Sequence, residues 1–176
     1  MRKSLLTMVA GILLLSFAGC DLGEEVSKEL DATIDVPADW AVEEESEGAV
    51  LVGKRYSKTM ENGYIKNIIL AKEVNHFTFK NQWIDDVADA LKEEFKTAKI
   101  RKPRAIKLGG LDGYEIDAII ELEDGILKSR FCVVRNKESF YYISLMVKKE
   151  YFKECLPEFK RIAKTFRLNS DKKHAK

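Results

Sequence analysis

The sequence predicts an α+β domain in which an antiparallel, strongly meandering β-sheet of about six to seven strands packs against a long central helix and a kinked C-terminal helix. Runs of β-branched and apolar residues bounded by turn residues occupy most of the chain between residues 32 and 168. The hydrophobic period changes to that of a helix in two segments. The 176 residues, 45% hydrophobic and 34% charged, suit one domain and exclude a disordered or polytopic membrane protein.

The first residues form the three-part pattern of a secretory signal. Arg2 and Lys3 precede an uncharged, mostly apolar run over residues 5–18, which is followed by Gly19 and Cys20. As a helix this run is about 21 Å long, well short of the roughly 30 Å hydrocarbon core of a bilayer. We therefore expect residues 1–19 to be a signal peptide rather than a membrane-spanning helix.

Residues 17–20 (Phe-Ala-Gly-Cys) resemble the bacterial lipobox, in which small residues precede a cysteine that is diacylated and becomes the N-terminus. The resemblance implies that Cys20 carries lipid, with Phe17 where the family usually has leucine. Two acyl chains suffice for stable anchoring. We expect an exported, lipid-anchored protein with residues 20–31 as a polar tether. Asp21 resembles a signal that retains lipoproteins on the periplasmic face of the inner membrane in diderm bacteria; the alternative is an ordinary linker residue. In a monoderm cell the protein would lie at the cell surface.

Three strands are predicted before the central helix, where β-branched or apolar residues run between turn residues. They cover Thr33–Val36, Ala49–Arg55 and Tyr64–Lys72. Residues 61–63 (Glu-Asn-Gly) are typical of a hairpin turn and join the last two strands. The acidic segment Glu43–Glu47 lacks the spaced Asp/Asn and Gly of a calcium loop, so we interpret it as a solvated turn.

The central helix is predicted over Phe79–Lys96, where apolar residues recur at helical spacing. Thr78 can cap its start, and acidic and basic residues lie opposite the apolar stripe. Trp83 lies on this stripe, so we expect it in the core.

A four-stranded meander is predicted after the central helix. Asp124-Gly125 is a preferred pair for a two-residue type I′ turn, which places Glu123 opposite Ile126. Alternation then predicts one apolar core face and one polar face, with Asp117 opposite Cys132 on the polar face. The four strands cover Arg104–Gly109, Gly113–Glu123, Ile126–Arg135 and Ser139–Val147.

The C-terminal helix is predicted over Tyr151–Phe166, with Phe166 on its apolar stripe. Pro157 lies inside it and cannot donate a backbone hydrogen bond, so we expect a kinked helix or two short ones. Residues 169–176 are polar and are expected to be a disordered tail. One domain over residues 32–168 remains.

The order of the predicted elements and three local segments carry a family resemblance. The segments are residues 34–40 (IDVPADW), 108–114 (LGGLDGY) and 159–166 (FKRIAKTF). Together they resemble the PsbP/Mog1-like fold, including the DcrB-like bacterial lipoproteins, over nearly all of residues 32–168. The resemblance implies a non-enzymatic accessory or binding protein, and it carries over no catalytic residue.

Two cysteines remain after lipidation, Cys132 and Cys155. An oxidising envelope permits a disulfide between them. The predicted hairpin, however, places Cys132 on the polar face, whereas the apolar stripe of the C-terminal helix brings Cys155 to the core face. Because side chains on opposite faces cannot reach bridging distance, we expect two free thiols. The alternative is that helices cover both faces of the sheet, which would let the C-terminal helix lie over Cys132 and permit the disulfide.

No set of residues points to catalysis or to a metal or cofactor. The chain has two histidines, and His174 lies in the predicted tail, so a histidine-based triad or zinc site would rest on His76 alone. The glycine-rich segment 108–113 lacks the Lys-Ser/Thr of a phosphate loop and is interpreted as a hairpin. A net charge of +1 gives no footprint for nucleic acid. We therefore expect no enzymatic activity, no cofactor and no nucleic-acid partner.

Aromatic side chains are the remaining candidates for a partner surface, because they give large contact area at low entropic cost. The candidates are Trp40, Tyr64, Tyr114 and Tyr142, and partial burial at the sheet is the alternative for each of them. The favoured function is a membrane-tethered, non-catalytic binding or accessory module that engages an unidentified envelope protein. The alternative is a carrier or chaperone for a small apolar ligand, which would need a cavity between the sheet and a helix.

Overall fold

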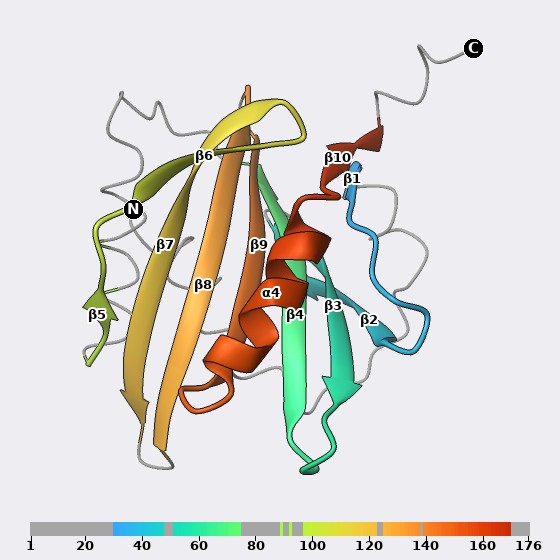
Figure 1. The fold of residues 1–176 in the computed structure, drawn as a ribbon. Coiled ribbons are helices and arrows are strands. Elements are labelled where there is room, and N and C mark those ends of the chain that lie inside the picture. Colours follow the sequence, from blue (N-terminus) through green and yellow to red (C-terminus); the bar gives the residue numbers. More distant parts are fainter. Residues whose placement is uncertain are drawn as a thin grey trace.

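The computed structural model describes residues 30–47, 51–74, 89, 92, 97–122, 125–137 and 139–169. An eight-stranded antiparallel sheet forms the body of the domain, and one helix, α4 (Phe152–Ala163), lies across one of its faces (Figure 1). This architecture confirms the predicted α+β class. The described residues hold one complete helix where two were predicted.

The sheet consists of two runs of hairpin-connected strands, which the pairing of β4 with β9 joins into one open sheet. Its strand order is β2-β3-β4-β9-β8-β7-β5, and β6 also pairs with β7. Hairpins join β2 to β3 and β4, and β6 to β7, β8 and β9, while β4 pairs with β9. The strands are β2 (Ala41–Glu47), β3 (Leu51–Thr59), β4 (Ile65–Val74), β5 (Lys99–Ile100), β6 (Arg104–Leu108), β7 (Leu111–Leu122), β8 (Gly125–Asn136) and β9 (Ser139–Lys148).

Two short strands tie the start of the domain to its end. β1 (Ala32–Thr33) pairs with β10 (Arg167–Leu168) in a separate two-stranded sheet. The predicted strand Thr33–Val36 is therefore shorter than expected and lies outside the main sheet. Its neighbour Asp35 forms a two-pronged ion pair with Arg167, at 2.7 and 2.9 Å.

Turn chemistry fixes two hairpins as predicted. Gly63 has a φ of 77° in the turn between β3 and β4. Gly109 and Gly110 have φ values of 55° and 77° between β6 and β7. Two consecutive positive φ angles are required in a two-residue type I′ turn and are accessible to glycine at little cost. The glycine-rich segment is thus a hairpin turn, not a phosphate loop.

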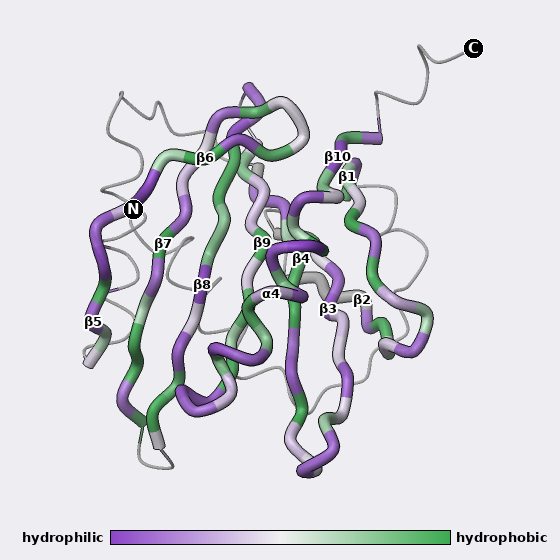
Figure 2. Tube along the Cα trace, in the orientation of Figure 1, coloured by the Kyte–Doolittle hydropathy of each residue, from purple (hydrophilic) through white to green (hydrophobic). Residues whose placement is uncertain are grey.

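Both faces of the sheet are buried, which corrects the prediction of one apolar and one polar face. Towards α4, the strands contribute residues such as Leu70, Val134 and Ile143 to a cluster that includes Phe159 and Ile162 of the helix. A second hydrophobic cluster covers the other face of the sheet. Hydrophobic and hydrophilic residues still alternate along many strands (Figure 2). The second cluster comprises Ile69, Ala71, Ile116, Ala118, Ile120, Phe131, Val133, Phe140 and Tyr142.

The register of the β7–β8 hairpin differs from the predicted one. Glu121, not Glu123, lies opposite Ile126, and Asp117 lies opposite Arg130 rather than Cys132. The shift is by an even number of residues, so each side chain stays on its predicted face. The observed register places opposite charges directly across the two strands, and this contact outweighs the turn preference of Asp124-Gly125.

Two further elements depart from the predictions, and α4 decides between two predicted forms. The acidic segment Glu43–Glu47 belongs to the edge strand β2 rather than to a turn, because β3 supplies a hydrogen-bonding partner for its backbone. The short strand β5 was not predicted. α4 runs as one helix through Pro157, so of the two predicted forms the pair of short helices is not found. Pro157 is exposed, so water can reach the carbonyl that its missing N–H would have bound.

Several predictions fall outside the described residues. They include the signal peptide 1–19, most of the tether 20–31, the tail beyond Asn169, and most of the central helix with Trp83. Asp89 and Lys92, which the structure does describe within that helix, are helical and form an ion pair at 3.0 Å.

Phe166 provides a test of the packing between the C-terminal segment and the sheet. It is 2% exposed, and its ring centroid lies 5.6 Å from that of Tyr141. Phe166→Ala should lower the free energy of unfolding by about 3–5 kcal/mol, because it leaves a cavity in the core. Urea unfolding followed by circular dichroism measures this change. Lys164→Ala, at an exposed neighbouring position, is the control; an unchanged midpoint for Phe166→Ala would contradict the assignment.

Candidate functional site

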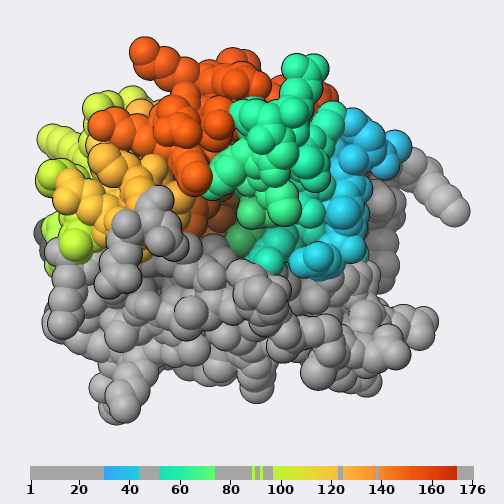
Figure 3. Space-filling view, turned by 90° about the horizontal axis from the view of Figure 1, so that it is seen from below, coloured from blue at the N-terminus to red at the C-terminus, as the bar shows by residue number. Residues whose placement is uncertain are grey.

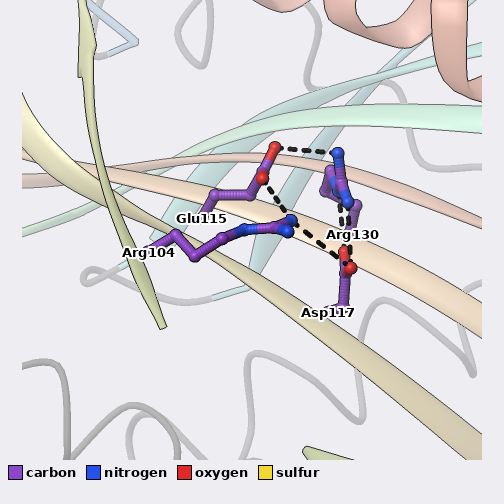
Figure 4. A network of polar contacts seen from close by, with 4 residues as sticks. All are labelled: Arg104, Glu115, Asp117 and Arg130. Atoms are coloured by element: carbon purple, nitrogen blue, oxygen red, sulfur yellow. Dashed lines mark hydrogen bonds and ion pairs between the residues drawn. The ribbon is translucent and has the colours of Figure 1, made fainter. Parts of the chain in front are cut away.

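α4 divides one face of the sheet into two flanks of different chemistry. Over β6, β7 and β8 lies an acid–arginine network of Arg104, Glu115, Asp117 and Arg130 (Figure 4). Over β3 and β4 lies an aromatic–lysine flank, defined here as Trp40, Tyr56, Tyr64, Lys66 and Tyr151.

The acid–arginine network is centred on a buried guanidinium. Arg130 donates two hydrogen bonds to Asp117, at 2.7 and 2.9 Å, and its Nη1 lies 2.9 Å from a carboxylate oxygen of Glu115. Arg104 reaches from β6 to Glu115 at 2.5 Å and to Asp117 at 3.5 Å. The guanidinium of Arg130 also lies 6.0 Å from the ring centroid of Phe152, at the start of α4. The carboxylates and guanidiniums therefore satisfy one another.

Electrostatics keep this network ionised. Burial raises the pKa of Asp117, but the hydrogen bonds and charge of Arg130 outweigh it, so the pKa lies below its ordinary value. Beside the network, Lys128 lies over Phe152 with its Nζ 4.2 Å from the ring centroid. Burial lowers the pKa of Lys128, and repulsion from Arg101, Arg130 and other cations adds to this, despite the charge of Asp117. The network is thus a paired structural element, not an open binding site.

In the aromatic–lysine flank Tyr64 and Tyr151 present partly exposed rings, whereas Trp40 and Tyr56 are buried. The Tyr64 and Tyr151 rings lie 5.2 Å apart at a tilt of 31°, and both residues are half-buried. Lys148 places its Nζ 5.2 Å from the Tyr64 centroid. Met60, from the β3–β4 turn, packs against the same core cluster, with its sulfur 3.9 Å from that of Cys155. The flank therefore joins the β3–β4 hairpin to the start of α4.

Trp40 extends the flank towards β2. Its indole ring is 5% exposed and lies under Lys66, whose Nζ is 5.0 Å from the ring centroid. Lys66 also forms an ion pair with Glu158 of α4. The indole Nε1 of Trp40 has no hydrogen-bond partner in the described part of the chain. Val42, two residues further on, is 52% exposed and adds apolar surface.

The structure brings together two of the four predicted partner-binding residues. Trp40 and Tyr64 belong to the aromatic–lysine flank, whereas Tyr114 and Tyr142 pack on the opposite face of the sheet. Trp40 and Tyr142 are each 5% exposed, so both follow the alternative of burial rather than forming open surface. Tyr142 donates a hydrogen bond of 3.0 Å to the buried Glu73. Burial, followed by the charge of Glu73, holds the pKa of Tyr142 well above its ordinary value.

Sequence reasoning missed the residues that complete the flank. Lys66 and its partner Glu158 are 92 positions apart, so no local spacing signals their pairing. Tyr151 directly precedes α4 and was assigned to the helix itself. Tyr64 directly precedes β4, and Tyr151 follows β9. Because β4 and β9 pair antiparallel, the start of β4 lies beside the end of β9, and the two ring centroids lie 5.2 Å apart.

The two thiols are free, as predicted, but the predicted reason was wrong. Cys132 and Cys155 are both buried in the cluster beneath α4, on the same side of the sheet. Burial, with the charge of Glu115, raises the pKa of Cys132 to about 12. Burial likewise raises the pKa of Cys155. Both thiols are therefore protonated at neutral pH and are poor nucleophiles.

The described ranges contain no grouping of three or more histidine, cysteine, aspartate or glutamate side chains placed to hold a metal ion. A helix with the length and hydrophobicity needed to cross a bilayer is also not found in that part of the chain.

Comparison with known proteins shows the fold. No family model and no curated protein matches the sequence. The solution structure of cyanobacterial PsbP from Synechocystis is similar, with a TM-score of 0.61 and 12% identity over 86% of this chain and 98% of that one. LpqN of Mycobacterium tuberculosis, described as involved in cell envelope biogenesis, gives 0.53 and 14% over 78% of this chain and 82% of its own. The fold is therefore PsbP/Mog1-like, whereas the narrower resemblance to DcrB-like lipoproteins stays a prediction.

Asp117 provides a pH-dependent test of the network. Because its folded pKa is lowered, its contribution to stability is present above the unfolded pKa of about 3.9 and is lost as pH falls through the folded value. Asp117→Asn should cost about 3 kcal/mol at neutral pH, since it leaves Arg130 buried with one fewer carboxylate. The difference from the wild type should shrink below about pH 4. Urea unfolding across pH measures it, with the exposed Asp112→Asn as control; a pH-independent difference would contradict the assigned role.

Proposed function

We propose that the PsbP/Mog1-like domain belongs to an exported bacterial lipoprotein, anchored through Cys20, that acts as a non-catalytic binding module of the cell envelope. In this proposal the aromatic–lysine flank is the contact surface for a protein partner. The supporting observation is the half-buried, tilted ring pair of Tyr64 and Tyr151, with Lys148 over the Tyr64 ring.

The chemistry of the flank supports protein binding. Tyrosine rings bring large apolar area and a hydroxyl group, and they lose little conformational entropy when a partner covers them. Tyr64 and Tyr151 each hold the other in place before binding, so little ordering remains for the partner to impose. Lys148 places positive charge at the margin of the paired tyrosines, which favours a partner with an acidic group beside an apolar centre.

The location rests on the N-terminal sequence, where a basic start, an apolar run and the small pair Ala18-Gly19 precede Cys20. The fold is compatible with this location, since LpqN, which shares it, is described as involved in cell envelope biogenesis. The carrier alternative gains no support from the described residues. Between the sheet and α4 the side chains of Phe152, Phe159 and Ile143 are at most 2% exposed and fill the interior.

Lipidation is tested by metabolic labelling with a radioactive fatty acid in a bacterial host. Label should enter the wild-type chain and be absent from Cys20→Ser, because only this cysteine follows the small pair at the end of the apolar run. Cys155→Ser, which alters a buried thiol, is the matched control and should label normally. Continued labelling of Cys20→Ser would overturn the proposed anchor.

The contact surface is tested by site-specific photo-crosslinking in intact cells. A benzophenone amino acid at position 64 or 151 should give the same discrete adduct, because both rings belong to one surface. The control is position 114, a half-buried tyrosine on the opposite face of the sheet. The adduct from position 151 should fall at least tenfold when Tyr64→Ala is introduced, in the range expected for a residue at the centre of an interface. An equal adduct from position 114, or none from positions 64 and 151, would contradict the proposal.

A further inference from the structure

The turn between β3 and β4 carries the dipeptide Asn62-Gly63 at the surface of the domain. Both residues are exposed, and neither belongs to a strand. The turn lies at the end of the domain where β3 and β4 meet the start of α4 (Figure 3). The proposed function involves Tyr64 of this hairpin and gives no role to Asn62.

An asparagine followed by glycine can convert without an enzyme. The backbone nitrogen of the glycine attacks the side-chain carbon Cγ of the asparagine, a C–N bond forms, and ammonia leaves with the proton of the former N–H. Water from the solvent then opens the cyclic imide at either carbonyl, which gives aspartate or isoaspartate. The sequence of steps needs no oxidant or reductant. Because glycine has no Cβ, its nitrogen is accessible for the attack.

The turn holds the two reacting groups close together. The carboxamide oxygen Oδ1 of Asn62 accepts a hydrogen bond of 3.0 Å from the backbone N–H of Tyr64. This bond folds the side chain back along the main chain of residues 62–64, so Cγ is held beside the peptide unit that contains the Gly63 nitrogen. The same N–H stabilises the negative charge that develops on Oδ1 during the attack, as donors do in an oxyanion hole.

One hydrogen bond opposes the reaction and has to open first. The N–H of Gly63 donates to the carbonyl of Met60 at 2.8 Å, and the N–H of Met60 donates to the carbonyl of Tyr64 at 2.7 Å. Gly63 has a φ of 77°, and apart from its chain neighbours no described atom lies within 4 Å of the position that a Cβ would take. Packing therefore does not hold this residue, and opening of an exposed turn costs much less free energy than global unfolding.

A second dipeptide of the same kind lies in a different environment. Asp112-Gly113 can form the same cyclic imide, with loss of water instead of ammonia. Gly113 is buried within β7, between Ile106 of β6 and Val134 of β8. A Cβ on it would clash with the carbonyl oxygen of Val133, so its backbone has no room to rotate. The sheet thus holds this dipeptide rigid, whereas Asn62-Gly63 is held by the turn alone.

We propose that Asn62 is a site of spontaneous deamidation, which adds a carboxylate to the β3–β4 turn. The product changes the aromatic–lysine flank, since the side chain at position 62 bonds to the backbone of Tyr64. Isoaspartate also lengthens the main chain of the turn by a methylene group, which shifts Tyr64 relative to Tyr151. Because Lys148 favours an acidic group on the partner, a carboxylate at position 62 weakens that contact. This last step rests on the proposed function, and the deamidation does not.

Peptide mapping of the full chain, purified in detergent and aged in a mildly alkaline buffer, measures the conversion. Trypsin releases residues 59–66, in which Asn62 is the only asparagine, and residues 67–72, in which Asn67 precedes the β-branched Ile68. Asn62 should become a mixture of aspartate and isoaspartate, while Asn67 stays intact and no isoaspartate forms at Asp112. Circular dichroism of the aged chain checks that the fold is retained.

The rate tests the part that the turn plays. The folded chain should convert no more than about tenfold more slowly than a free peptide of residues 59–66, because an exposed turn opens at small free-energy cost. Asn62→Gln, which keeps an amide on a longer side chain, should show no conversion at this position. A slower rate in the folded chain, or conversion of Asn67 equal to that of Asn62, would overturn the site.

The effect on binding is measured with the benzophenone amino acid at position 151 in intact cells. Asn62→Asp, which reproduces one product, should lower the adduct roughly two- to fivefold, the range of one exposed charge contact. Asn62→Gln is the neutral control and should keep the wild-type amount. An unchanged adduct in Asn62→Asp would overturn the effect on the contact surface. The peptide map does not depend on any adduct, so failure of the deamidation is distinguishable from failure of the proposed function.

Discussion

The buried charge of Arg130 is the interaction on which the arrangement of the sheet depends. A guanidinium stays ionised inside a protein, so its burial is strongly unfavourable unless carboxylates pair with it; Asp117 and Glu115 on the neighbouring strand do so at 2.7 to 2.9 Å. That requirement selects the register of β7 against β8 over the one that the turn residues favour. The same guanidinium lies near Phe152, so the start of α4 is placed against the charge as well.

Burial of both sheet faces explains why the central strands contain long hydrophobic runs. β9 is buried at seven of its ten positions, and side chains of either parity contact a core. The broad faces of such a sheet are covered, so among the described residues a contact surface is to be sought at the margins of the helix or at the ends of the strands. The half-buried pair Tyr64 and Tyr151 lies at the margin of the helix.

Elements that depend on local signals in the sequence were predicted. Features that depend on contacts between distant segments were not. The glycines of the β3–β4 and β6–β7 turns and the apolar stripe ending at Phe166 act within a few residues, and their elements were predicted. The strand character of Glu43–Glu47 depends on a partner strand rather than on its own composition, so it was missed. For the site, Trp40 and Tyr64 were found by residue type, whereas Tyr151 and the Lys66–Glu158 pair depend on the closure of the sheet.

The meeting of the two chain ends has a mechanical consequence. Any pull on the residues before Leu30 reaches the domain through β1, which is held to β10 over two residues. Peeling β1 away would draw Leu30, Ala32 and Ile34 out of the core before any strand of the main sheet is disturbed. The domain therefore has a short segment that can separate under tension while the main sheet keeps its shape.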